Sequence, residues 1–199
     1  YNDAIHDGLL ASILQSLDAQ NGIDEIIYFN GRSIVPVGAS KYLDGSGNRP
    51  VSKHESVPAL NLAEISGKLQ QSKRIVIIDG LDSTKEFHSG PASFRPVKKD
   101  EPPSPQESLK KILEDGPLQG TFVIAFADNW KRCNSSCKDL LGFFEMRVGF
   151  CMNEDDAGSF VSGAIGKFKG LETDNRAVFA DRLKNQVSWF RPYINGESL

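Results

Sequence analysis

Cysteine and histidine are both scarce in this sequence. An odd, sparse set of three cysteines argues against a disulfide framework and for a reducing compartment, which we expect to be the cytoplasm. Two of them, Cys133 and Cys137, are four residues apart and would share a helix face, but no further Cys or His stands near them. The histidines show no ligand spacing: His6, His54 and His88. The sequence therefore predicts neither a disulfide scaffold nor a Cys/His metal site.

Long hydrophobic runs and a strong charge of one sign are also absent. No apolar run approaches the roughly 20 residues that cross a bilayer, and no signal peptide opens the chain. A net charge of −3 exerts no overall attraction on nucleic acid, so a DNA contact would need a local basic patch. With 39% apolar and 25% charged residues in 199, the chain is typical of one soluble domain with a sizeable core.

A P-loop is missing as well. Its pattern, G-x-x-x-x-G-K-[ST], supplies amides that cradle phosphates and a hydroxyl that holds Mg²⁺. The nearest string, "GAIGKFKG" (163–170), lacks the first glycine at the right distance and has Phe168 in place of the hydroxyl residue. The chain starts at Tyr1 inside an expected helix, so we expect it to be a fragment of a longer protein whose preceding residues could carry such a loop.

Hydrophobic periodicity predicts alternating helices and strands. Helices are expected over residues 3–20, 58–72, 105–115, 135–144 and 154–168. Strands are expected over residues 24–30, 74–81, 120–129, 145–152, 176–181 and 186–193. Ser104 and Glu107 form a capping-box pattern with Pro105 at the first helical position. The continuous apolar strands predict right-handed βαβ crossovers, a mainly parallel sheet with helices on both faces, and a terminal hairpin.

Two stretches are predicted to be irregular. Residues 39–57 are polar and glycine-bearing, and residues 83–104 hold most of a cluster of five prolines, so the second stretch is expected to be a long exposed loop. The whole chain, 1–199, is otherwise expected to form a single module.

Two acidic residues follow apolar strands. Asp79 ends "RIVIID" and Asp128 follows "GTFVIAFA". Because ligands in parallel sheets bind beyond the carboxyl ends of the strands, these carboxylates could form a metal or phosphate-facing rim. They could equally be ordinary strand-exit residues, since Asp favours turns. The string "DGLDST" (79–84) fits neither D-x-S-x-S, typical of metal-dependent adhesion sites, nor D-x-D-x-T, typical of haloacid dehalogenases.

Four stretches in this order resemble the ATPase domain of the FtsK/SpoIIIE family, within the FtsK–HerA superfamily of RecA-like motors. They are "RIVIIDGLDS" (74–83), "LKKILEDGPLQGTFVIAFADN" (109–129), "EMRVGFCMNEDDAGSFVSG" (145–163) and "DNRAVFAD…WFRPY" (174–193). The match covers most of the chain from about residue 60. It implies an α/β, RecA-like three-layer fold with a mainly parallel central sheet, apparently truncated at the N-terminal strand and P-loop, with a C-terminal β-hairpin.

The resemblance also implies roles for individual residues. Asp79 takes the Walker B place, where it would orient Mg²⁺ beside ATP, but Gly80 stands where the catalytic Glu is expected. Asp128 stands at the sensor position, a Gln in typical family translocases. Arg147 lies in the strand near which the family places an arginine that acts across a ring interface; otherwise it is a strand-edge arginine. Without the water-positioning carboxylate, we expect slow ATP hydrolysis or none.

Three functions remain open from the sequence. The first is a degenerate ATPase module of a DNA translocase or a DNA-linked defence protein, contributing assembly, regulation or partner contact. Its partners would be other modules or ring subunits, and double-stranded DNA. The second is a non-enzymatic protein-interaction module like the degenerate modules of specialised secretion systems. The third is an enzyme with metal ligands at Asp79 and Asp128, which no nucleophile or His supports.

Basic residues available for DNA are Lys98, Lys99, Lys110, Lys111, Lys131 and Arg132, although a solvated surface is the preferred interpretation.

Overall fold

The computed structural model describes residues 3–32, 36–43, 45, 51–54, 59–67, 73–89, 102–161 and 177–191. The chain forms two compact units, Asn2–Leu140 and Leu141–Leu199, and each has its own sheet. The prediction of a single module stays a prediction. Among the described helices, none is both long and apolar enough to cross a membrane.

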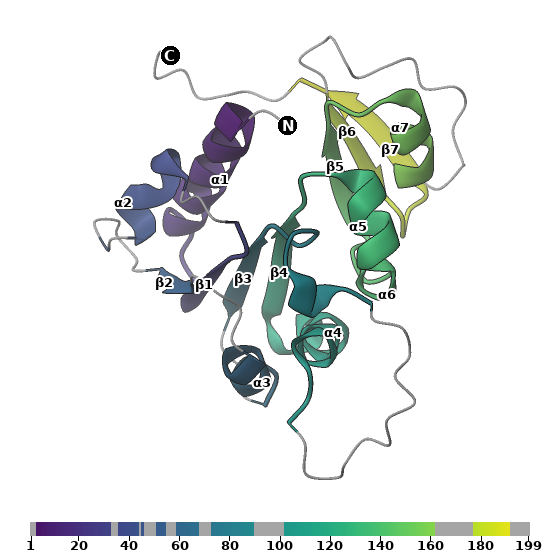
Figure 1. Ribbon diagram of the computed structural model, residues 1–199. Helices are drawn as coiled ribbons and strands as arrows, with labels where there is room; N and C mark the ends of the chain where they lie inside the picture. Colours follow the sequence, from purple (N-terminus) through teal and green to yellow (C-terminus); the bar gives the residue numbers. More distant parts are fainter. Residues whose placement is uncertain are drawn as a thin grey trace. The chain divides into compact units, whose positions relative to one another are not determined.

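The first unit contains the helices and strands that precede residue 141 (Figure 1). Its α-helices are α1 (Asp3–Asp18), α2 (Ser40–Leu43), α3 (Ala59–Gly67), α4 (Pro105–Asp115), α5 (Trp130–Ser136) and most of α6 (Lys138–Leu141). Its strands are β1 (Glu25–Asn30), β2 (Ser52–His54), β3 (Arg74–Asp79) and β4 (Thr121–Phe126). Short 3-10 helices are η1 (Val37–Ala39), η2 (Lys85–Phe87) and η3 (Pro117–Gln119).

The four strands of this unit form one parallel sheet in the order β2-β1-β3-β4. The sequence "RIVIID" is therefore an inner strand, as its continuous apolar run predicts. Asp79, the last residue of β3, is in register with Asn30 of β1 and Phe126 of β4. The carboxyl ends of three strands are thus level, and the predicted α/β class with a parallel sheet is confirmed.

Helices cover both faces of this sheet. On one face, Leu10 and Leu14 of α1 pack with Tyr28 and Ile77 in a single buried cluster. Side chains alternate along a strand, so the adjacent strand residues, such as Ile78, face the opposite side. Figure 1 shows α3 and α4 side by side and apart from α1. A fully buried aliphatic side chain contributes about 1.5–3 kcal/mol, so these two layers of contacts hold the predicted three-layer arrangement.

The start of α4 matches its sequence pattern. The Ser104 hydroxyl accepts a hydrogen bond from Glu107 N at 3.2 Å, and the Glu107 carboxylate accepts one from Ser104 N at 2.8 Å. Pro105 occupies the first turn. The hydrogen bonds from the backbone and side chain of Ser104 lower the pKa of Glu107. The predicted capping box is confirmed.

Two local predictions for the first unit are wrong. Residues 39–57, predicted to be a loop, contain α2 and β2. The pairing of β2 with β1 is a tertiary contact that a polar sequence does not reveal. The helix predicted over residues 135–144 is instead α5 and α6. The first of these begins earlier because Asn129 Oδ1 accepts from Arg132 N at 2.8 Å and caps Trp130 onward.

The predicted exposed loop of residues 83–104 is only partly described. Its first part contains η2, in which Phe87 is fully buried. Residues 90–101 lie outside the described residues, so the loop stays a prediction there. The string "GAIGKFKG" (163–170) also lies outside them, as does the end of the helix predicted over residues 154–168.

The second unit contains an antiparallel sheet in the order β5-β6-β7 and one described helix. Its elements are β5 (Met146–Phe150), α7 (Glu154–Phe160), β6 (Ala177–Asp181) and β7 (Gln186–Phe190). The predicted terminal hairpin is confirmed, whereas the antiparallel pairing of β5 with β6 was not predicted. A Cβ on Gly149 would lie 2.5 Å from Met152 Sδ and 3.3 Å from Phe160 Cε1, so α7 packs closely on that face.

Candidate functional site

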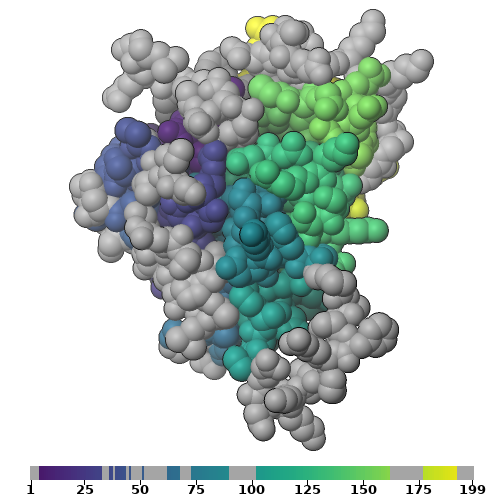
Figure 2. Space-filling view, in the orientation of Figure 1, coloured from purple at the N-terminus to yellow at the C-terminus, as the bar shows by residue number. Residues whose placement is uncertain are grey.

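Three loops meet at the carboxyl edge of the parallel sheet. The loop after β1 is tied to β3 by Gly31 N, which donates to Asp79 O at 2.7 Å. The loop after β3 is tied to β4 by Leu81 N, which donates to Phe126 O at 2.8 Å. Figure 2 shows the segment after β3 at the surface, where Ser83 and Lys85 are exposed. This edge is where ligands bind in parallel α/β sheets.

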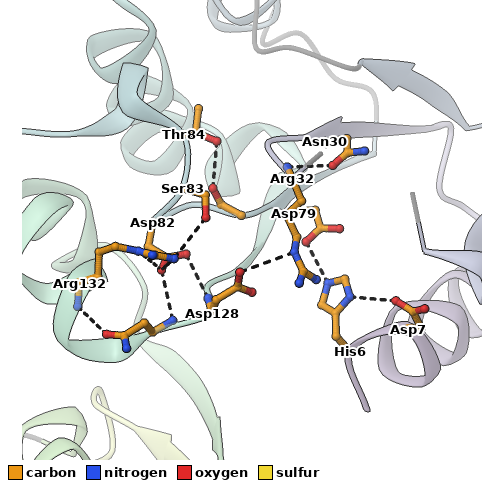
Figure 3. Close-up of polar contacts among 12 residues, drawn as sticks. His6, Asp7, Asn30, Arg32, Asp79, Asp82, Ser83, Thr84, Asp128 and Arg132 are labelled. Carbon is orange, nitrogen blue, oxygen red and sulfur yellow. Dashed lines mark hydrogen bonds and ion pairs between the residues drawn. The ribbon is translucent and has the colours of Figure 1, made fainter. Parts of the chain in front are cut away.

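Asp79 is buried at the centre of this edge, with a side chain that is 0% exposed. The Tyr28 hydroxyl donates a hydrogen bond to Asp79 Oδ2 at 2.7 Å. His6 Nε2 lies 2.9 Å from Asp79 Oδ1 at ion-pair distance, although Oδ1 receives no well-directed hydrogen bond from the described residues. Figure 3 shows His6 reaching Asp79 from α1. One carboxylate thus joins a helix and two neighbouring strands.

His6 belongs to the buried stripe of α1. It precedes Leu10 and Leu14 by four and eight residues, which places all three on one helix face. Its ring meets Phe126 edge to face, with centroids 5.0 Å apart and planes at 78°. Its Nδ1 lies 3.3 Å from Asp7 Oδ1.

The charge state of His6 follows from these neighbours. Burial alone lowers the pKa of His6, but the Asp79 carboxylate and then Asp7 raise it, against the opposing charge of Arg32. The net shift of the pKa is upward. The arrangement therefore favours an imidazolium beside the buried carboxylate.

The same carboxylate also acts on Tyr28, where its effect is to disfavour the charged form of the phenol. Burial and the negative charge of Asp79 both raise the pKa of the Tyr28 phenol. Because a raised pKa keeps the phenol protonated, Tyr28 remains a hydrogen-bond donor to Asp79 Oδ2. The two oxygens of Asp79 therefore face two different protein groups.

Gly80 has the backbone of a position reserved for glycine. Its φ is +87°, a conformation that costs other residues free energy. A Cβ there would lie 2.9 Å from Arg32 Cγ and 3.3 Å from Gly31 C. Any side chain at this position, including the expected catalytic Glu, would have to displace Arg32.

Arg32 links the loop after β1 to the loop after β4. Its Nε lies 3.6 Å from Asp128 Oδ2, and the two side chains are 17% and 23% exposed. Burial raises the pKa of Asp128, the negative charges of Asp82 and Asp79 add to this, and Arg32 and His6 oppose it. Asp79 and Asp128 therefore lie at one edge, as their positions predict, but Arg32 and His6 accompany them (Figure 3).

Asp82 forms a separate contact at the same edge. Its side chain is buried, and Oδ1 accepts from Asp128 N at 3.0 Å while Oδ2 accepts from Asn129 N at 3.2 Å. Arg132 Nε also donates to Oδ2 at 2.8 Å, and Arg132 Nη2 forms an ion pair with the same oxygen at 2.7 Å. This carboxylate fixes the loop after β3 to the start of α5.

Arg147 lies in the second unit. Its guanidinium donates to three backbone carbonyls, those of Leu141 at 2.7 Å, Phe144 at 3.0 Å and Phe160 at 3.4 Å. These bonds tie β5 to the ends of α6 and α7. The role across a ring interface stays a prediction, and it would require Arg147 to leave these carbonyls.

The residues around Asp79 do not fit a bound Mg²⁺. Mg²⁺ requires oxygen ligands in a near-octahedral shell that keeps several waters. Asp79 is fully buried, and its two oxygens face the Tyr28 hydroxyl and the His6 ring. Within the described part of the chain, no group of three or more His, Cys, Asp or Glu side chains could hold a metal ion. The third function open from the sequence, a metal enzyme using Asp79 and Asp128, stays a prediction, and it would require His6 or Tyr28 to move away from Asp79.

The residues that most shape the site were not predicted. His6 was counted among scattered histidines, and Tyr28 and Arg32 were not singled out. The usable signal was the position of His6 four residues before Leu10, which places a polar ring on the face that packs against the sheet. Its partner on that sheet depends on the tertiary fold.

Comparison with solved structures identifies the fold of this chain. No family model matches the chain, and no curated protein matches it in sequence. A solved structure of the genome packaging NTPase B204 from Sulfolobus turreted icosahedral virus 2 with ATP-gammaS is similar, with a TM-score of 0.54 and 10% identity over 96% of this chain and 91% of that chain. The same NTPase with AMPPCP has a TM-score of 0.52 and 10% identity over 92% and 88%. The chain therefore has a P-loop NTPase-like fold.

Proposed function

We propose that the chain is a degenerate ATPase module of an FtsK/SpoIIIE-type motor, a DNA translocase or a DNA-linked defence protein, that contributes assembly, regulation or partner contact more than hydrolysis. The fold supports the ATPase ancestry, because the similar packaging NTPase was solved with ATP analogues. ATP is accordingly the nucleotide that we expect the module to bind. The sequence resemblance described above supports the choice of motor family.

The observation that carries the proposal of weak hydrolysis is position 80. Phosphoryl transfer depends on positioned groups, and the carboxylate that would orient the attacking water is absent at Gly80. The positive φ at Gly80 and the close approach of Arg32 mean that the loop leaves no room for a side chain at position 80. The fold has therefore adapted to glycine rather than merely lost a side chain.

Calorimetry with ATPγS and a phosphate-release assay with ATP test this proposal. We expect binding with a turnover about a hundredfold or more below the ~10 s⁻¹ of a typical enzyme. Both are measured on the chain and, if the natural polypeptide is longer, on that polypeptide. Phosphate release at the rate of a typical enzyme that disappears in Asp79→Ala but persists in Asp115→Ala, a change at an exposed acid, would contradict the proposal.

A variant that adds a carboxylate at position 80 tests the same proposal. Gly80→Glu restores the missing carboxylate in sequence, but we expect no gain in turnover. The new side chain must displace Arg32, and the positive φ at position 80 would be strained in a residue other than glycine. We also expect a lower free energy of unfolding. A folded Gly80→Glu protein that hydrolyses ATP at the rate of a typical enzyme would show that only the side chain was missing.

The DNA context has a separate test. Among the basic residues, Arg132 is bound to Asp82, whereas Lys98 and Lys99 lie outside the described residues. Binding to duplex DNA, measured by fluorescence anisotropy over a salt series, should weaken steeply as salt rises, with a slope set by the number of phosphates contacted. Binding that does not respond to salt, or no binding by the natural polypeptide, would count against a translocase.

A protein-interaction module is the second candidate, and exposed apolar residues on the second unit favour it. The register places Met146, Val148 and Phe190 on the same sheet face, opposite Gly149 and α7, with 69%, 46% and 39% of each residue exposed. Exposed apolar groups of this kind are typical of interaction sites. A chain that binds no ATPγS but binds a protein partner, with an affinity that Val148→Lys lowers, would favour this candidate over the first.

A further inference from the structure

We propose that His6 takes the place of Mg²⁺ at Asp79, so that this Walker B-position carboxylate is an internal ion-pair partner and not a metal ligand. The inference rests on the proposed function, since it concerns how a nucleotide-binding module of this fold would work. Its consequence is that nucleotide affinity should not depend on a divalent cation held at Asp79.

The first argument is occupancy. Tyr28 Oη lies 2.7 Å from one oxygen of Asp79, and His6 Nε2 lies 2.9 Å from the other. The side chains of His6 and Asp79 are both 0% exposed. A cation or its water shell could reach Asp79 only after one of these groups had moved away.

The second argument is charge. A buried carboxylate is costly unless it is paired with an opposite charge, and Oδ1 of Asp79 receives no well-directed hydrogen bond from the described residues. His6 Nε2 lies within ion-pair distance of that oxygen, at 2.9 Å. Arg32 is a further positive group whose charge is felt at His6. A divalent cation bound at Oδ1 of Asp79 would have to displace the His6 ring from its position 2.9 Å away.

The third argument is packing. His6 shares its helix face with Leu10 and Leu14, which are both fully buried in the cluster beneath α1. The ring also contacts Phe126 at a centroid distance of 5.0 Å. Because core packing resists displacement of α1, His6 is held in place by groups other than Asp79. The ion pair is therefore part of the fold.

Titration with Mn²⁺, followed by electron paramagnetic resonance, tests the proposal without nucleotide. In the wild-type chain we expect no Mn²⁺ site at Asp79, so Asp79→Asn should leave Mn²⁺ binding unchanged. We expect His6→Gln, which removes the competing charge, to raise Mn²⁺ affinity at least about tenfold, since each 1.4 kcal/mol of lost repulsion is tenfold. The matched control, His88→Gln, should leave Mn²⁺ binding unchanged.

Two results would overturn the proposal. One is Mn²⁺ bound by the wild type and lost in Asp79→Asn. The other is the absence of any gain in His6→Gln, which would show that His6 is not what excludes the cation. Should a variant fail to fold, Mn²⁺ broadening of the Gly80 and Leu81 amide signals in the wild-type NMR spectrum decides the question, because a cation at Asp79 would broaden both.

A nucleotide titration separates this proposal from the proposed function. We expect the affinity for ATPγS to change less than about twofold between Mg²⁺ and EDTA, which is well under 1.4 kcal/mol. A loss of affinity in EDTA that Asp79→Asn reproduces would overturn the inference alone. No binding of ATPγS in either condition would overturn the proposed function, while the Mn²⁺ result would still decide the role of His6.

Discussion

Asp79 and Asp82 lie three residues apart on the segment that leaves β3, and both are buried, but their surroundings differ. Asp82 accepts hydrogen bonds from two backbone amides and from the Arg132 guanidinium. Asp79 is contacted by two side chains, those of Tyr28 and His6. Both sets of partners lie far away in sequence, but Asp82 is held by backbone amides and a guanidinium, whereas Asp79 is held by a phenol and an imidazole.

The two carboxylates differ in whether the charge state of their partners can change with pH. Asp82 closes a loop onto its neighbour with backbone donors whose charge state is fixed. Asp79 depends on His6, whose pKa the carboxylates of Asp79 and Asp7 raise against the effect of burial, and on a phenol that burial keeps protonated. Substitutions at the two sites should therefore have different signatures.

The largest effect is expected for Asp82→Ala. The change leaves the amides of Asp128 and Asn129 without their acceptor and strands the Arg132 guanidinium, so the free energy of unfolding should fall by about 3–5 kcal/mol. Urea unfolding followed by circular dichroism measures it. Ser83→Ala, which removes only the partner of Arg132 Nη2 at 3.3 Å, should change stability far less. If Asp82→Ala and Ser83→Ala lose the same free energy of unfolding, the contacts of Asp82 with the two amides and Arg132 have no special weight.

A smaller effect is expected for Tyr28→Phe. This change removes the donor to Asp79 Oδ2 while keeping the ring in the core, and should lower the free energy of unfolding by about 1.5–3 kcal/mol, the range for hydrogen bonds to charged groups. Urea unfolding again measures it, with Tyr42→Phe in the same core as the control. If both variants lose the same amount, the bond to Asp79 has no special weight.

The smallest effect is expected from pH. The pKa of His6 is raised in the folded protein, so its contribution to stability is complete below the unfolded value of about 6.5 and is lost as pH rises through the folded value. The charged groups around it are Asp79, Asp7, Arg32 and Asp128. Urea unfolding near pH 6 and near pH 8 should show wild-type stability falling relative to His6→Gln. A rise across this range would mean that burial dominates and that His6 is neutral.

The sequence predicted the parts of the fold that depend on local patterns. The apolar run ending at Asp79 gave an inner strand, and Ser104 with Glu107 gave a capped helix start. The β2 strand was missed because its pairing with β1 depends on tertiary contact more than on its own residues. The antiparallel pairing of β5 was missed because alternating helices and strands predict parallel crossovers.

The candidate site was predicted in position but not in composition. The ends of apolar strands located Asp79 and Asp128 correctly at the carboxyl edge. His6 and Arg32 could not be assigned from spacing, because their partners are far away in sequence and are brought close by the sheet register and by α1. The meaning of Gly80 also sharpened, since its positive φ shows a backbone adapted to glycine.

A double-mutant cycle between His6 and Asp79 tests the central claim most directly. The free energy of unfolding is measured for the wild type, His6→Gln, Asp79→Asn and the double variant. Because the side chains are buried and 2.9 Å apart, the account predicts a favourable coupling of about 1–3 kcal/mol, larger near pH 6 than near pH 8. Additive effects within about 0.3 kcal/mol would show that His6 does not hold Asp79 and would contradict the account.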